Sequence, residues 1–145
     1  MIALLDVNVL IALFDPGHVH HHAAHQWFAD NKKSGWASCP LVENAVIRIL
    51  SNPAYPGRRT TLQDAASRLS SFCSSGNHQF WADHLSIRES SRFLWNHVQG
   101  HHQLTDVYLL ALAVSKGGRL VTFDGTISRR AVDGARPQNL TVIVE

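Results

Sequence analysis

Short apolar runs alternate with longer segments that carry apolar residues at helical spacing. Three of the runs are rich in residues that favour β-structure and are bounded by polar residues or glycine, which predicts buried strands at 2–6 (IALLD), 119–124 (RLVTFD) and 140–145 (LTVIVE). A shorter strand is predicted at 35–38 (GWAS). Helices are predicted over 20–31, 40–50, 61–74, 86–98 and 105–115. This alternation indicates an α/β fold with a mainly parallel central sheet covered on both faces.

Two acidic residues stand at the ends of predicted strands. Asp6 closes the first strand inside the apolar run MIALLDVNVLIALF, and Asp124 closes the strand 119–124. In open parallel sheets the ligand crevice lies beyond the carboxyl ends of the strands, so both acids are candidates for a site. An ionised acid is costly to bury unless its charge is compensated. We therefore expect a bound cation to compensate the charge of Asp6.

Two further acids lie on predicted helices. Glu43 falls between the rows of Ile47 and Leu50 on helix 40–50, on the arc that this helix is expected to bury. Asp106 lies in the first turn of the nearly all-apolar helix 105–115, with Thr105 as the expected N-cap. An acid in a first turn often only complements the helix dipole, and this alternative stays open for Asp106.

The four acids Asp6, Glu43, Asp106 and Asp124 each occupy a position that would face one crevice. Two carboxylates about 4 Å apart repel by roughly 4 kcal/mol at an effective dielectric constant near 20, so such a cluster needs a cation or shared protons. Oxygen ligands without Cys or His favour Mg²⁺ or Mn²⁺ over Zn²⁺. The four positions together predict a carboxylate-bound Mg²⁺ or Mn²⁺ site.

Composition bounds the setting of this site. The 145 residues, 45% of them hydrophobic, predict a single domain over residues 1–145. The net charge of +2 does not by itself indicate a polyanionic partner. The two cysteines, Cys39 and Cys73, have no CxxC spacing and suit a reducing compartment. No signal-peptide pattern or run of membrane-spanning length occurs, so we expect a cytoplasmic protein without a membrane partner.

Four stretches of the sequence, in order, are similar to the successive signatures of PIN-domain nucleases: LLDVNVLIALF, ENAVIRIL, LTDVYLLALAVSKGGRLVTFD and the terminal LTVIV. The chain most resembles the VapC-type toxins of bacterial toxin–antitoxin pairs. The resemblance implies a PIN-like three-layer α/β/α fold and an endoribonuclease that uses Mg²⁺ or Mn²⁺. It also implies a homodimer that is inhibited by a cognate antitoxin. On this resemblance Asp6, Glu43, Asp106 and Asp124 are the acidic metal-binding set, with Asn8 and Thr122 as polar support.

The chemistry of such a site suggests a role for each residue. A metal held by carboxylates can activate water for attack on an RNA phosphodiester and neutralise the developing charge. We expect Asp6, Asp106 and Asp124 to bind the metal. Glu43 either binds it through water or accepts a proton from the attacking water. Asn8 and Thr122 are expected to orient these ligands.

Basic residues outside the acidic set are candidate RNA contacts. They are the pair before helix 105–115 and two pairs in loops: His101, His102, Arg58, Arg59, Arg129 and Arg130. Arg binds phosphate in a bidentate manner, but paired arginines on a solvated face are as ordinary. The run HVHHHAAH places His18 and His22, and His21 and His25, at the i, i+4 spacing of a helical Zn²⁺ site. We expect these imidazoles to cap, to be solvated or to lie at the cleft rim instead.

Two other functions are compatible with parts of this pattern. An aspartate-based phosphotransfer domain also places Asp at strand ends, but LLDVNV has Asn8 where the dehalogenase pattern needs a second Asp, and no Lys follows the last strand as in receivers. A non-catalytic PIN-like RNA-binding module would keep the fold and lose cleavage. The presence of all four acids argues against this second alternative.

Overall fold

The computed structural model describes residues 1–74 and 76–144, and its centre is a parallel sheet. The strands are β1 (Ala3–Leu5), β2 (Trp36–Ser38), β3 (His78–Phe80), β4 (Arg119–Thr122) and β5 (Leu140–Val142). Their order is β3-β2-β1-β4-β5, and all four pairings are parallel. In register, Ala3 of β1 pairs with Trp36 of β2 on one side and with Arg119 of β4 on the other. The predicted parallel sheet is therefore confirmed.

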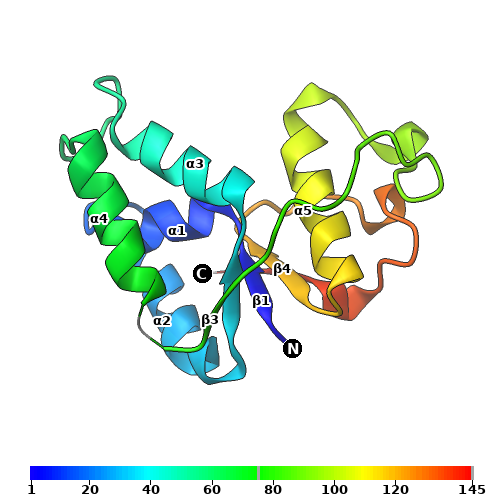
Figure 1. Ribbon diagram of the computed structural model, residues 1–145, viewed down its shortest axis with the longest axis horizontal. Coiled ribbons are helices and arrows are strands. Elements are labelled where there is room, and N and C mark those ends of the chain that lie inside the picture. Colours follow the sequence, from blue (N-terminus) through cyan, green and yellow to red (C-terminus); the bar gives the residue numbers. More distant parts are fainter. Residues whose placement is uncertain (75, 145) are drawn as a thin grey trace.

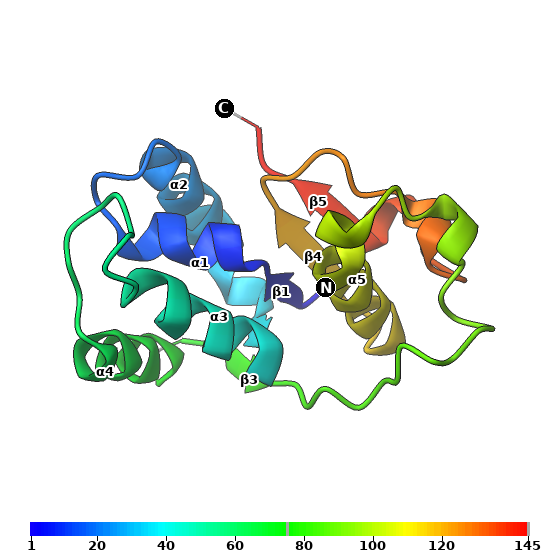
Figure 2. The same cartoon turned by 90° about the horizontal axis from the view of Figure 1, so that it is seen from above.

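Helices cover both faces of the sheet. They are α1 (Val7–Phe14), α2 (His21–Asn31), α3 (Pro40–Leu50), α4 (Leu62–Cys73) and α5 (Leu104–Ser115). Figures 1 and 2 show α1 to α4 grouped on one side of the sheet and α5 on the other. This arrangement is the predicted three-layer α/β/α architecture. None of the helices in the described part of the chain combines the length and apolarity needed to cross a membrane.

The order in which successive strands are added to the sheet reverses between β1 and β4. From β1 the chain moves outward through β2 to β3, and from β4 it moves outward in the opposite direction to β5. The central strands are the most buried, with Leu4, Leu5, Leu120 and Val121 all fully enclosed. In open α/β sheets, ligands bind beyond the carboxyl ends of the strands at such a reversal. The topology thus places a candidate crevice beyond the ends of β1 and β4.

Helix α1 and strand β3 are absent from the elements that the sequence predicts. All eight residues of α1 except Asn8 are apolar, so the segment shows no helical period, and α1 buries residues from Val9 to Phe14. Strand β3 is a short edge strand in which His78 is partly buried and Gln79 and Phe80 are exposed. Neither element carries the local pattern on which such a prediction depends.

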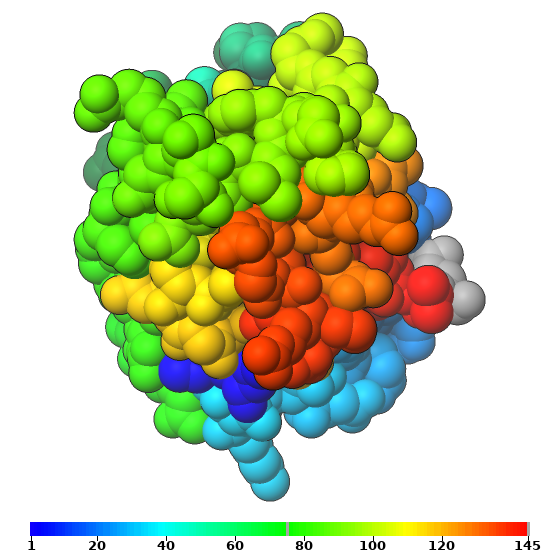
Figure 3. All heavy atoms as spheres, turned by 90° about the vertical axis from the view of Figure 1, so that its right-hand side faces the viewer, coloured from blue at the N-terminus to red at the C-terminus, as the bar shows by residue number. Residues whose placement is uncertain are grey.

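The predicted helix over 86–98 is wrong. The segment runs as turns and extended chain, with one short 3₁₀ helix at Trp95–His97. Its backbone pairs with the loop after β4: Phe93 forms an antiparallel bridge with Val132, and Leu94 N–H donates to Ala131 O. The ring of Phe93 is buried and stacks on Tyr108 of α5. Figure 3 shows this segment (yellow-green) beside the loop after β4 (orange) on one face. Tertiary hydrogen bonds here replace those of a helix.

Candidate active site

Asp6 lies directly beyond β1 and is buried at the start of α1. Its side chain caps the helix by accepting a hydrogen bond from Val7 N–H at 2.7 Å, and Thr122 Oγ1 donates to Asp6 Oδ2 at 2.7 Å. Burial raises the pKa of Asp6, although the hydrogen bonds from Thr122 and Val7 act in the opposite direction. The negative charge of Asp124 also raises it. The hydrogen bonds thus fix the position of the carboxyl group, while burial and the charge of Asp124 disfavour its ionised form.

Asn8 and Thr122 link the start of α1 to the end of β4. Asn8 Nδ2 donates to Thr122 Oγ1 at 3.1 Å, and Asn8 Oδ1 accepts from Phe123 N–H at 3.3 Å. Thr122 Oγ1 also accepts from Asp124 N–H at 3.0 Å. The fully buried hydroxyl of Thr122 therefore contacts Asp6, Asn8 and the backbone of Asp124 at once. Such a network orients the two acids relative to each other.

Asp124 lies in the turn after β4 and is more exposed than Asp6. Its Oδ1 accepts hydrogen bonds from Thr126 N–H at 2.8 Å and from Thr126 Oγ1 at 2.7 Å. These bonds lower the pKa of Asp124 because they stabilise its ionised form. Asp124 is therefore a carboxylate that stays charged beside Asp6.

Asp106 is brought to the same place by α5. The helix begins at Leu104 after a 3₁₀ turn (His101–Gln103), so the expectation that Thr105 is its N-cap is wrong. Gln103 occupies the cap position, and its side chain donates to Thr126 O, which ties the helix start to the Asp124 turn. Burial, then the charges of Asp6 and Asp124, and then a hydrogen bond with Asp124 raise the pKa of Asp106 to about 7. Three aspartates from β1, α5 and β4 thus influence one another's ionisation.

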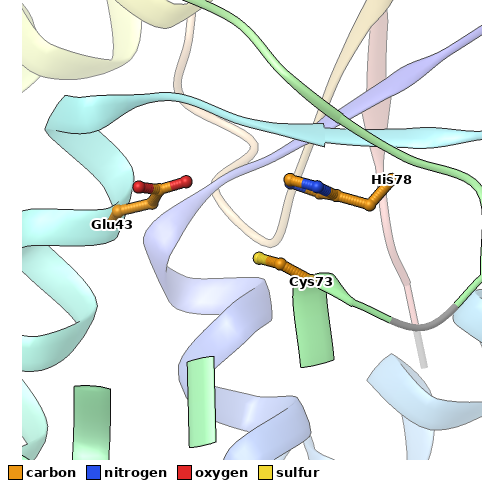
Figure 4. Close-up of side chains that lie close together, drawn as sticks. All are labelled: Glu43, Cys73 and His78. Atoms are coloured by element: carbon orange, nitrogen blue, oxygen red, sulfur yellow. The ribbon is translucent and has the colours of Figure 1, made fainter. Parts of the chain in front are cut away.

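Glu43 has a different set of neighbours. It lies in the first turn of α3, beyond β2, and its Oε2 accepts a hydrogen bond from Ser38 Oγ at 2.6 Å. Ser38 Oγ is also 2.8 Å from His78 Nε2 and 4.0 Å from Cys73 Sγ. Figure 4 shows the side chains of Glu43, Cys73 and His78 directed toward one another. The charge of Glu43 acts on the pKa values of Cys73 and His78, whereas the three aspartates respond to one another.

The aspartates form a donor set suited to a hard divalent cation. They offer carboxylate oxygens only, and their mutual repulsion would be relieved by positive charge. However, the three aspartates do not each place a carboxylate oxygen within 4.8 Å of the other two. In the described part of the chain, that spacing occurs only for Glu43, Cys73 and His78. The chemistry of the aspartates fits Mg²⁺ or Mn²⁺. The most closely spaced donor group instead combines a carboxylate, a thiol and an imidazole.

The candidate RNA contacts are all exposed. His101 and His102 form the 3₁₀ turn before α5, with ring centroids 3.9 Å apart. Arg58 and Arg59 lie in the loop before α4. Arg129 and Arg130 follow the Asp124 turn and, with His97, line a surface hollow of about 590 Å³. His101 and His102 therefore lie next to the start of α5, which carries Asp106. Arg129 and Arg130 lie shortly after the turn that carries Asp124.

The histidine run caps a helix. His21 Nδ1 is 2.7 Å from Ala12 O, and His25 Nε2 is 3.1 Å from Leu13 O, so both rings hydrogen bond carbonyls at the end of α1. The ring of His20 stacks on Phe123, with centroids 4.5 Å apart, beside Asp124. Within residues 1–74 and 76–144, no histidine of the run joins a group of three closely spaced metal donors. The expected capping is confirmed for His21 and His25.

Sequence reasoning missed the polar residues that support the acids. Ser38, His78, Gln103 and Thr126 all form side-chain hydrogen bonds at the carboxyl end of the sheet or at the start of α5. Ser38 is the last residue of a predicted strand, the same signal that identified Asp6 and Asp124. His78 follows no such signal because strand β3 is not apparent in the sequence.

Comparison with known proteins agrees with this architecture. The family model described as PIN domain matches residues 3–133. Ribonuclease VapC44 of Mycobacterium tuberculosis is 41% identical over 143 residues, which are 99% of this chain and 100% of that protein. Ribonuclease VapC39 of the same organism is 43% identical over 134 residues, 92% of this chain and 96% of that protein. The chain belongs to the PIN-domain family and, within it, to the VapC-type nucleases, as the resemblance predicted.

Solved structures show the same fold at low sequence identity. The crystal structure of Mycobacterium tuberculosis VapC20, described as a Sarcin-Ricin loop cleaving toxin, has a TM-score of 0.62 at 17% identity, and the match covers 93% of this chain and 99% of that one. VapBC2 from Rickettsia felis, bound to a DNA fragment from its promoter, has a TM-score of 0.62 at 14% identity. That match covers 98% of this chain and 97% of the other.

Proposed function

We propose that this protein is the toxin of a VapBC-type pair and that it acts as an endoribonuclease dependent on Mg²⁺ or Mn²⁺. The observation that carries the proposal is the convergence of Asp6, Asp106 and Asp124 at the reversal point of the sheet, with the pKa of Asp106 raised to about 7. Crowded carboxylates at such a crevice are costly unless a cation is bound. The names of the relatives, ribonucleases of the VapC group, support RNA as the substrate.

In this function each side chain has a distinct task. Asp6, Asp106 and Asp124 would hold the cation, which when bound supplies an activated water and charge neutralisation at the scissile phosphate. Thr122 and Asn8 keep Asp6 oriented through their hydrogen bonds. Glu43, one strand further along the sheet, is positioned by Ser38 to accept a proton from the water or to bind the cation through water.

Partners follow from the charge of the crevice. RNA would be held by exposed basic residues: His101, His102, Arg129 and Arg130 near the segments that carry Asp106 and Asp124, and Arg58 and Arg59 in the loop before α4. Helix α5 begins two residues before Asp106, and the first N–H groups of a helix suit a phosphate. We further propose a cognate antitoxin segment bearing Arg or Lys, because a cation on that segment would compensate the same carboxylates. With RNA as substrate, we expect the protein to act in the cytoplasm.

The decisive experiment compares two first-turn acids. Purified protein is incubated with total RNA in Mn²⁺, in Mg²⁺ or in chelator, and the cut ends are mapped. We expect cation-dependent cleavage that falls by at least about 100-fold in Asp106→Asn, a loss on the scale of removing a transition-state stabilising group. Asp64 occupies the same first-turn position on α4 but is exposed, so Asp64→Asn is the matched control and should cleave normally.

Melting curves complete this experiment. Mn²⁺ should raise the melting temperature of the wild type clearly and that of Asp106→Asn much less, because a ligand that binds only the folded state stabilises in proportion to its affinity. Retained cleavage in Asp106→Asn, with an undiminished Mn²⁺ shift, would remove Asp106 from the site. RNA binding without cleavage in any cation would instead indicate a non-catalytic PIN-like module.

A further inference from the structure

A second group of metal-binding side chains lies one strand away from the aspartates. It contains the carboxylate of Glu43 from α3, the thiol of Cys73 from the last turn of α4 and the imidazole of His78 from β3. One donor atom from each lies within 4.8 Å of the others, and Figure 4 shows the three side chains turned toward one region. All three residues are partly buried. Three different elements, of which α4 and β3 follow one another in the sequence and α3 lies about 30 residues earlier, thus present three different ligand types to one place.

The centre of this group is organised by Ser38. Its hydroxyl donates to Glu43 Oε2 at 2.6 Å and lies 2.8 Å from His78 Nε2 and 4.0 Å from Cys73 Sγ. The hydroxyl has a single proton, so when it donates to Glu43, its contact with His78 requires the imidazole to donate. Ser38 is itself fully buried at the end of β2. The hydroxyl therefore holds the side chains of Glu43 and His78 close together, and Zn²⁺ binding at Nε2 would release the proton that Nε2 donates to Ser38.

The donor types select a class of cation. Thiolate, imidazole and carboxylate together are ligands of Zn²⁺, whereas Mg²⁺ prefers oxygen ligands alone. Zn²⁺ binds these donors at roughly 2.0–2.3 Å, so bound donors lie about 3–4 Å apart. The present limit of 4.8 Å means that small side-chain rotations would close the site. A water would supply the fourth ligand.

We propose that Glu43, Cys73 and His78 form a Zn²⁺ site that is separate from the aspartate crevice. Cys73 and His78 have no task in RNA hydrolysis as proposed above. Glu43, however, belongs to both groups, since it is also one of the four predicted catalytic acids. This regulatory role rests on the proposed function. Zn²⁺ at this site keeps the carboxylate of Glu43 away from the aspartate crevice and thereby lowers RNA cleavage. The site is a point at which a thiophilic cation regulates the nuclease.

Cobalt titration tests the binding directly. Co²⁺ takes the place of Zn²⁺ and, when bound to a thiolate, produces a sulfur-to-metal charge-transfer band; the aspartates contain no sulfur and cannot produce it. We expect one equivalent of Co²⁺ to give this band in the reduced wild-type protein and one equivalent of Zn²⁺ to remove it. Cys39 is the matched control because it is the only other cysteine in the sequence and is buried in the core. Cys39→Ser should keep the band, and Cys73→Ser should lose it.

Two further variants separate ligands from neighbours. His78→Gln should weaken Co²⁺ binding by more than about tenfold. Loss of a residue that only orients a metal ligand already weakens binding by about 10- to 100-fold, so loss of a ligand should weaken it at least as much. Asp106→Asn should leave the band unchanged. Circular dichroism melts confirm that each variant is folded. Absence of the band in folded wild-type protein, or its persistence in Cys73→Ser, would overturn the proposed site.

The regulatory consequence has its own readout. Stoichiometric Zn²⁺ should reduce Mn²⁺-dependent RNA cleavage in the wild type and in Cys39→Ser but not in Cys73→Ser. Inhibition that persists in Cys73→Ser would overturn the coupling through Glu43. If no RNA is cleaved under any condition, the proposed nuclease function fails, while the Co²⁺ band still decides whether the Zn²⁺ site exists.

Discussion

At the scale of single residues, the burial of Asp6 has two explanations that act together. The carboxylate caps α1 and accepts a hydrogen bond from Thr122, so its charge is partly stabilised by the protein itself. Burial nevertheless raises its pKa, which leaves a remaining cost for a cation to offset. The protein therefore supplies part of the compensation that the sequence analysis expected from a cation.

Thr122 is the residue on which the acids depend most. Thr122→Val removes the donor to Asp6 and the acceptor for Asn8 and for Asp124 N–H. Because the lost bonds involve a buried ionisable group, we expect the free energy of unfolding to fall by roughly 1.5–3 kcal/mol. Thr122→Ser keeps the hydroxyl and loses only a buried methyl group, which should cost about 0.5–1.5 kcal/mol. Urea unfolding measures both; equal stability of the Val and Ser variants would contradict the network.

Asp106 should make the metal-free protein less stable as pH rises. In the folded state its pKa is about 7, against an ordinary value of 3.8, so between these pH values the folded state binds more protons than the unfolded state. Stability is thus fully present below pH 3.8, falls as pH rises toward 7 and then levels off. The side chain is partly exposed, so solvent screening reduces the size of the effect.

Melting temperatures in chelator across this pH window provide the measurement. Asp106→Asn should flatten the decline, because an amide does not ionise, and Asp64→Asn should keep the wild-type slope. Asp124 does not mask the effect, since its lowered pKa acts only below pH 3.8, and the raised pKa of Asp6 leaves a smaller decline of the same sign in Asp106→Asn. Parallel curves for the wild type and Asp106→Asn would show that the pKa of Asp106 is not raised in the folded protein.

At the scale of elements, α1 is held by side chains outside its own span. Asp6 caps its first turn, and His21 and His25 from α2 bond the carbonyls of Ala12 and Leu13 near its end. The last carbonyls of a helix have no partner within the helix, so these rings supply two of the missing donors. The histidine run is thereby explained as a connection between α1 and α2.

Replacement of His21 and His25 should therefore affect stability and leave chemistry intact. Each lost hydrogen bond is worth about 0.5–1.5 kcal/mol, so the double alanine variant should unfold more easily by roughly 1–3 kcal/mol. Metal-dependent RNA cleavage well below the melting temperature should stay within several-fold of the wild type. His22→Ala, on the exposed side of α2, is the control. A loss of cleavage equal to that of Asp6→Asn would make the histidines candidates for the site again.

At the scale of the whole molecule, the surface keeps several large apolar side chains exposed. They are distributed over the strand edges, the helices and the segment before α5: Val19, Leu41, Leu62, Phe80, Ile87, Trp95, Leu104 and Val144. Val19 and Val144 also line an open hollow of about 720 Å³ between α2 and the end of the chain that follows β5. The contiguous apolar lining of this hollow, more than the separate exposed side chains, favours association.

We expect the protein to be a homodimer on this ground, since closed two-fold dimers are the commonest assemblies of soluble proteins. Light scattering at micromolar concentration should give about twice the mass of the 16.1 kDa chain. Dilution should shift the mass toward that of the monomer if the interface is reversible. A stable monomer over the whole concentration range would contradict the expectation.

The sequence by itself determined the fold class, four of the five strands and four of the five helices. Strand runs such as LVTFD are apolar between polar boundaries, and helix 40–50 has clear 3.6-residue spacing, so local chemistry is sufficient to predict them. It also placed Asp6, Asp106 and Asp124 at the ends of elements that a parallel sheet brings together. These predictions needed only periodicity and the geometry of parallel sheets.

Only the tertiary structure decided which side chains share an environment. Helix α1 is too uniformly apolar, and strand β3 too polar, to be identified without their neighbours. The segment 86–98 exchanged helical hydrogen bonds for bonds to the loop after β4 because Phe93 packs against α5. Glu43 meets Ser38 across the short connection from β2 to α3, whereas it meets Cys73 and His78 because β3 lies beside β2. Contacts between residues 30 or more positions apart depend on strand order, and no local pattern encodes that order.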